Sequence, residues 1–201
     1  MIKELIIGNS MKTIKSYYPD YDKEQLERIQ YGLEAIYLSL TKVIAIIFLS
    51  IVLSIFKETL ILLLLFNILR MTAFGIHATK SWMCWITSIP TFIGIPLICR
   101  HFTFPLYVLM IISVFCLINF ILFAPADTVK RPLIRKKKRI IYKFLTIVIG
   151  IIYTFLIIFN DNHFIQNALT FSLLIETILI NPLTYKLFNM SYNNYKSFKK
   201  Q

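Results

Sequence analysis

The chain has 201 residues, 57% of them hydrophobic, and apolar runs recur along most of its length. A soluble domain would show apolar stripes instead of long runs, so the composition excludes that class and predicts an all-α polytopic membrane protein. The 22 Lys and Arg residues outnumber 10 Asp and Glu, giving a net charge of +12. Because the apolar runs place the chain in lipid, this charge favours anionic membrane lipid over nucleic acid as its neighbour.

Residues 1–30 are predicted to be a cytoplasmic amphipathic leader. An apolar stripe at helical spacing suits a helix lying on an anionic membrane surface, and a solvated leader helix is the alternative. The stripe consists of Ile7, Met11, Ile14 and Tyr18. Pro19 ends this helix, and Asp22 followed three residues later by Gln25 predicts a new helix start.

The membrane region is predicted to extend over residues 31–185, as about six transmembrane or re-entrant helices. The apolar runs are 31–56, 59–69, 85–99, 104–124, 141–159 and 164–180. Lys57 and Glu58 are predicted to form a tight turn. The run 59–69 is only about 16 Å of helix, roughly half a bilayer. A basic cytoplasmic tail, 186–201, completes a single domain of 1–201.

The distribution of Lys and Arg predicts the orientation. With six crossings and both termini cytoplasmic, only Lys57 and Arg100 fall outside and Lys42 falls within a span, while all other cations lie inside. The positive-inside rule favours this arrangement. It places the loop between the second and third crossings on the cytoplasmic side of the cell membrane.

That loop contains His77 and Cys84, seven residues apart. A thiol needs a base to become a thiolate near neutral pH, and histidine is the usual base. The pair therefore predicts a cysteine nucleophile at a lipid boundary. The alternative reading is that both residues are structural.

The geometry of the pair imposes a condition. Seven residues of straight helix rise about 10.5 Å, whereas a thiol–imidazole hydrogen bond needs roughly 3–3.5 Å. Either the chain bends, which Gly75 permits, or the partner comes from another subunit. Cys99 and Cys116 fall in other predicted spans, and no second His/Cys pair has ligand spacing, so neither a metal site nor a cofactor is expected.

Four segments resemble one known family. Residues 70–84 contain Arg70, Gly75, His77-Ala78 and Cys84; residues 31–34 read Tyr-Gly-Leu-Glu; residues 124–132 read Ala-Pro-Ala-Asp-Thr-Val-Lys-Arg-Pro; residues 181–186 read Asn-Pro-Leu-Thr-Tyr-Lys. Together, and in their order along the chain, they resemble the accessory gene regulator protein B (AgrB) family, the membrane peptidases of Gram-positive quorum sensing. Phe74 stands where the family usually has a glycine, and Arg131 where lysine is common.

The resemblance implies a membrane-embedded cysteine endopeptidase. Such an enzyme removes the C-terminal segment of a small precursor peptide (AgrD), keeps the remainder as a thioester, and lets an internal cysteine of the precursor close a thiolactone ring. Cys84 is then the nucleophile and His77 the general base and acid. Arg70, Gly75 and Glu34 are supporting residues, and a homodimer is the expected assembly.

A dense basic cluster follows the 124–129 segment. It consists of Lys130, Arg131, Arg135, Lys136, Lys137, Lys138 and Arg139. One interpretation is topology control and binding of lipid headgroups. The other is a substrate-binding site for the acidic C-terminal segment that the resemblance implies for the precursor. Asp127, just before the cluster, is a candidate for orienting His77.

Two intramembrane charges remain, Lys42 and Glu176, and they are predicted to pair because such groups are costly when they face lipid. They also support the alternative function, a small multi-pass transporter or exporter without peptidase chemistry. The chain lacks the detectable inverted halves that such folds often show. A non-enzymatic membrane scaffold, which would need neither His77 nor Cys84, is a further alternative.

Overall fold

The computed structural model describes residues 2–76, 81–128 and 133–199. Over this part of the chain the regular structure is helical, and Phe74 pairs with Ala126 in an isolated bridge. The all-α prediction is therefore confirmed. The chain forms two compact units, Met1–Leu49 and Ser50–Gln201.

The first unit contains α1 (Ile2–Tyr17) and most of α2 (Lys23–Val52). The helix start predicted at Asp22 is present. The Gln25 N–H donates to Asp22 Oδ1 over 2.7 Å, and the Asp22 N–H donates to Gln25 Oε1 over 3.1 Å. This reciprocal pair satisfies backbone donors that have no partner inside the helix. Helix α2 begins at Lys23, so residues 23–30, which were predicted to belong to the leader, are continuous with the helix of the first apolar run.

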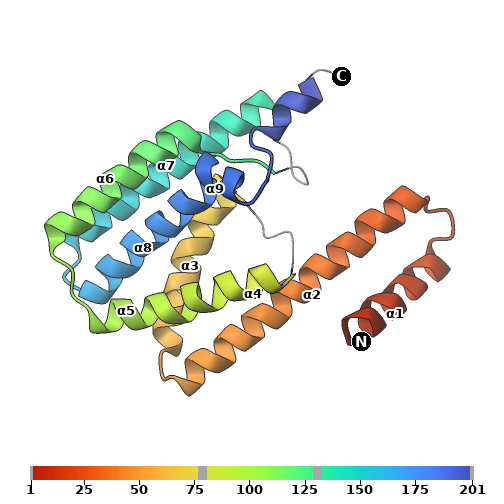
Figure 1. Cartoon of the computed structure of the whole chain (residues 1–201), viewed down its shortest axis with the longest axis horizontal. Helices are drawn as coiled ribbons and strands as arrows, with labels where there is room; N and C mark the ends of the chain where they lie inside the picture. The colour runs from red at the N-terminus through yellow and green to blue at the C-terminus, as the bar shows by residue number, and fades with distance from the viewer. Residues whose placement is uncertain (1, 77–80, 129–132, 200–201) are drawn as a thin grey trace. The chain divides into compact units, whose positions relative to one another are not determined.

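The second unit is a helical bundle. Its elements are α3 (Phe56–Ala73), α4 (Ser81–Ile89), the π-helical turn η1 (Pro90–Gly94), α5 (Ile95–His101), α6 (Leu106–Phe123), α7 (Lys136–Phe159), α8 (His163–Ile180), α9 (Pro182–Leu187) and the 3-10 helix η2 (Asn194–Lys199). Helices α6, α7 and α8 pack side by side, and α3 packs against α7 and α8 (Figure 1). Helix α8 is the most enclosed, and its buried face includes Asn167, Ser172 and Glu176.

Four helices in the described part of the chain are long and apolar enough to cross a membrane: α2, α6, α7 and α8. The two further crossings predicted from the sequence fall on α3 and on the run α4–η1–α5. The count of six crossings and the amphipathic nature of α1 stay predictions.

Two local predictions in this region are wrong. The tight turn lies at residues 53–55, where Ser54 has a φ of 56°, and Lys57 and Glu58 instead lie in the first turn of α3. Helix α3 has 18 residues, about 27 Å, and not the eleven of its apolar run. Polar residues extend a helix beyond its apolar stretch, because the backbone hydrogen-bond pattern does not depend on side-chain polarity.

Pro90 does not break the third apolar run. It begins η1, and the helical run continues to His101. Proline lacks an N–H donor and its ring crowds the preceding turn, and a π-helical turn accommodates both without ending the helix.

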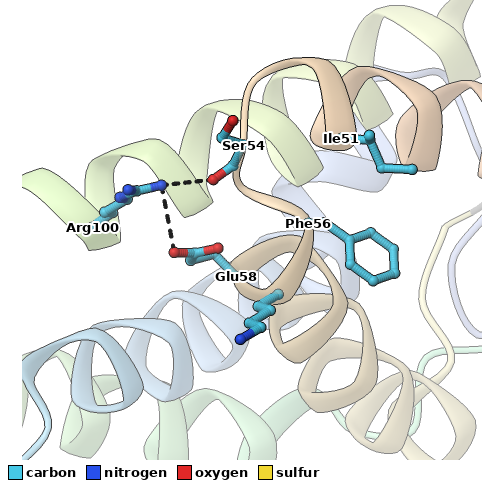
Figure 2. Close-up of a pocket in the computed structure, with 6 residues that line it drawn as sticks. Ile51, Ser54, Phe56, Glu58 and Arg100 are labelled. Atoms are coloured by element: carbon cyan, nitrogen blue, oxygen red, sulfur yellow. Dashed lines mark hydrogen bonds and ion pairs between the residues drawn. The ribbon is translucent and has the colours of Figure 1, made fainter.

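The bundle of the second unit has two distinct ends. At one end Arg100 Nη1 donates to the Ser54 carbonyl over 2.8 Å and lies 3.6 Å from Glu58 Oε1 (Figure 2). A pocket of about 420 Å³ lies beside this contact, and Lys57 lines it. At the other end of α3 lie Arg70 and the residues that lead to His77. The structure thus places Lys57 and Arg100 at the opposite end of the bundle from Arg70, and the side of the membrane that each end faces stays a prediction.

Candidate active site

The two predicted catalytic residues lie at the limit of what the structure describes. His77 is outside the described residues. Cys84 lies in the first turn of α4, and its side chain is outside them as well. The site is therefore built here from the segment that leads into His77, residues 70–76, and from its neighbours.

Helix α3 ends at Ala73, and the next two residues turn the chain sharply. Phe74 and Gly75 both have positive φ, 63° and 85°. Three backbone hydrogen bonds then hold the segment from two sides. The Gly75 N–H donates to Ala126 O over 2.9 Å, the Ala126 N–H to Ala73 O over 3.0 Å, and the Ile76 N–H to Leu179 O over 3.0 Å. The chain before His77 is thus fixed between the α6–α7 connection and the end of α8.

Arg70 is the third anchor of this segment. Its Nη2 donates to the carbonyls of Gly75, over 3.4 Å, and of Ile76. Its Nη1 lies 3.4 Å from Oε1 of Glu176, whose side chain is fully buried. A buried carboxylate is costly without a partner, so the pairing holds the guanidinium in place to bind these carbonyls.

This contact corrects the predicted partner of Glu176 and shows what Arg70 binds. The partner of Glu176 is Arg70, whereas the sequence suggested Lys42. Arg70, predicted as a supporting residue, has its guanidinium engaged with Glu176 and with the backbone of residues 75 and 76. Sequence reasoning missed Glu176 as part of this end of the bundle. The signal that could have found it is a carboxylate near the end of one apolar helix together with an arginine at the end of another.

Gly75 is required by its surroundings as well as by its φ. A Cβ at this position would lie 2.5 Å from Arg70 Nη1 and 2.7 Å from Leu179 O. We expect Gly75→Ala to lower the free energy of unfolding by about 2–3 kcal/mol, because it combines left-handed strain with two close contacts. Gly94→Ala is the matched control, since Gly94 is helical and its added Cβ meets nothing within 4 Å. Chemical unfolding in mixed micelles measures both, and equal stability of the two variants would contradict this role of Gly75.

Asp127 holds the C-terminal segment. Its Oδ1 accepts from the Asn194 N–H over 2.9 Å, and its Oδ2 accepts from the N–H groups of Tyr195, over 2.8 Å, and Leu133, over 3.4 Å. The Tyr185 hydroxyl donates to the Asp127 carbonyl over 3.1 Å. These contacts give the carboxylate a structural role in joining the tail to the α6–α7 connection.

The described part of the basic cluster, residues 135–139, lies at the same end of the bundle. Lys130 and Arg131 lie outside the described residues. Arg135 is the N-cap residue of α7, and residues 136–139 form its first turn. The Phe74 ring packs edge-on against Tyr142 of α7, with centroids 4.9 Å apart, which joins the turn before His77 to the helix that carries the cluster. Cations at a helix N-terminus oppose the helix dipole, so helix stability does not explain their presence.

Glu34 belongs to the first unit. It lies in α2, where Gln30 Nε2 donates to Glu34 Oε1 over 3.4 Å. The structure therefore shows this local partner of Glu34, and its predicted supporting role stays a prediction.

The fold defines the class of the protein: a multi-helix membrane protein in which one end of a bundle is organised around a fixed turn and a basic helix start. A model of one family, Accessory gene regulator B, matches residues 8–180. The chain belongs to this AgrB family, and membership implies a role in the accessory gene regulator quorum-sensing system.

Individual relatives agree with this assignment. The chain is 30% identical over 178 residues to a putative AgrB-like protein of Clostridium acetobutylicum, covering 88% of this chain and 84% of that protein. It is 30% identical over 165 residues to the accessory gene regulator protein B of Staphylococcus aureus, covering 82% of this chain and 87% of that protein. No solved structure matches the chain.

Proposed function

We propose that this protein is a membrane-embedded cysteine endopeptidase that processes an AgrD-like precursor peptide. The observation that carries the proposal is the anchoring of residues 73–76. Three backbone hydrogen bonds and the Arg70–Glu176 pair hold the chain that leads directly to His77. A catalytic base needs a fixed backbone, because small displacements of a reacting group cost large factors in rate.

The other histidines and cysteines support the choice of His77 and Cys84. His101 ends α5 and His163 begins α8, at the end of the bundle that contains Arg100. Cys99 and Cys116 are buried, with exposed fractions of 2% and 0%, and have no access to a substrate. Cys84 is the remaining cysteine of the chain and lies in α4.

The proposed reaction has two acyl transfers. His77 takes the proton of the Cys84 thiol, and the thiolate attacks the scissile carbonyl carbon. The C–N bond breaks, His77 returns the proton to the leaving amine, and the precursor remains bound through a thioester. The thiol of an internal precursor cysteine then attacks the same carbonyl. Its S–C bond replaces the bond to Cys84, whose thiol is restored by proton transfer.

We further propose that the basic cluster binds the acidic C-terminal segment of the precursor. The side chains of Arg135, Lys137 and Lys138 are exposed and available for this contact. The turn before His77 packs on the same helix through Tyr142, so a peptide bound there lies close to the segment that leads to His77. The end of the bundle that carries the cluster is proposed to face the cytoplasm, since cations are enriched there. A homodimer stays a prediction.

The test is a search for the acyl-enzyme. The full chain would be coexpressed with a candidate precursor that has an amphipathic helix, an internal cysteine and an acidic tail. The precursor cysteine would be changed to alanine so that the thioester accumulates. Intact-mass and peptide mass spectrometry should find the truncated precursor attached to Cys84 and released by hydroxylamine. Raised salt should lower the yield at low precursor concentration, because exposed charges are screened over about 8–10 Å. An unmodified Cys84 alongside cleaved precursor would contradict the proposal.

A further inference from the structure

The basic cluster, together with Lys143 further along α7, has two sides that the sequence does not distinguish. Lys136, Arg139 and Lys143 are separated by three and four positions and share one face of α7, whereas Lys137 and Lys138 lie on other faces. The first three line a pocket of about 490 Å³. Its other walls are the end of α6 with the two residues that follow it, and three tail residues, Tyr192, Asn193 and Tyr195.

Arg139 indicates what the pocket binds. Its guanidinium carbon lies 3.5 Å from the ring centroid of Tyr195, which orients the planar group. Its Nη1 atom is buried and has no hydrogen-bond partner among the described residues. Arg139 as a whole is half-buried and lines the pocket, so an anion there can contact its side chain, and a charge-assisted contact would offset the cost of burying this donor.

The remaining lining adds no negative charge. Neither Asp nor Glu is among the described residues that line the pocket. Burial, together with the nearby Tyr195 and Asp127, raises the pKa of Tyr192 to about 12, so its phenol stays neutral, and its hydroxyl donates to Phe123 O over 3.2 Å. The nearby Asp127 carboxylate accepts from the N–H groups of Asn194 and Tyr195, so the three cations outnumber the negative charge beside them and suit an anion.

The position of the pocket favours a lipid anion. Helix α6 ends at Phe123 and α7 begins at Lys136, and both helices are long and apolar enough to span a membrane, so the pocket lies at the depth of the headgroups. Its rim carries two aliphatic side chains from these helices, Leu122 and Ile140, with exposed fractions of 62% and 59%. A ligand that suits this surface has an anionic group and continues into an apolar chain.

We propose that this pocket binds the phosphate-bearing headgroup of an anionic phospholipid. Arg139 receives the phosphate, Lys136 and Lys143 flank it, and the acyl chains lie along Leu122 and Ile140. Arginine suits this role because its planar fork matches phosphate oxygens. Basic pockets at the ends of spanning helices are known to take anionic lipid headgroups. This inference does not depend on the proposed peptidase activity, and it leaves the other members of the basic cluster to bind the acidic segment of the precursor.

The experiment uses the full chain in detergent and needs no precursor. Native mass spectrometry would titrate dimyristoyl phosphatidylglycerol and dimyristoyl phosphatidylcholine against the wild type and two charge-matched variants. Lys136→Gln with Arg139→Gln alters the pocket, and Lys137→Gln with Lys138→Gln removes the same charge outside it. We expect phosphatidylglycerol affinity to fall at least tenfold in the first variant and less than threefold in the second. Phosphatidylcholine should bind weakly to all three.

Four outcomes would overturn the proposal. Equal loss in both variants would show a general surface attraction to anions. Equal binding of the two lipids would show that the phosphate-bearing anionic headgroup is not recognised. Displacement of the lipid by inorganic phosphate at similar concentration would assign the pocket to free phosphate. Stronger competition by a synthetic acidic peptide would assign it to a peptide. If the double pocket variant does not fold, Lys143→Gln against Lys138→Gln gives the same comparison.

Discussion

Cys84→Ser is expected to lower the rate of precursor processing by about a thousandfold or more. A serine hydroxyl is much harder to ionise than a thiol, and the ester that it would form exchanges less readily with the precursor thiol. Both acyl transfers are therefore lost together. The measurement is the appearance of cleaved C-terminal segment and of thiolactone product in membranes that contain a defined amount of enzyme.

His77→Ala is expected to cause a comparable loss in the same assay. The double variant should be little slower than either single variant, because groups that act as one unit are non-additive. Cys99→Ala and Cys116→Ala are the matched controls. These thiols are buried, so the two changes should affect stability more than the chemical step. Normal cleavage by a Cys84→Ala variant would remove cysteine catalysis from consideration.

Arg70→Met is expected to cost about 3–5 kcal/mol of the free energy of unfolding. It leaves the carboxylate of Glu176, whose side chain is fully buried, without its ion-pair partner. It also removes the donor to the carbonyls of Gly75 and Ile76. Processing should fall with stability, and chemical unfolding in mixed micelles gives the stability change.

The double variant Arg70→Met with Glu176→Met separates stability from positioning. Replacing a whole buried ion pair with apolar groups of similar size is often neutral or stabilising, so most of the lost stability should return. Processing should not return, because methionine cannot bind the two carbonyls that hold the chain before His77. Recovery of both quantities would mean that Arg70 acts only by neutralising Glu176.

Local patterns in the sequence determined several features of this protein. The Asp22–Gln25 pair predicted a helix start, since a capping box needs only residues three positions apart. Long apolar runs predicted the helices that became α6, α7 and α8, within a few residues at each end. Gly75 was predicted to permit a bend, and the chain turns there with a φ of 85°. The ordered motifs also identified the family.

The tertiary structure decided which distant residues meet. Arg70 and Glu176 are 106 positions apart, and their pairing depends on how α3 packs against α8, which no periodicity within either helix encodes. Asp127 joins a tail 67 residues later because both approach the same end of the bundle. In the sequence, the basic cluster and Lys143 form one stretch that is rich in Lys and Arg. Only the helical geometry of α7, with the tail packed beside it, separates Lys136, Arg139 and Lys143 in a pocket from Lys137 and Lys138, because a helix directs neighbouring residues to different faces.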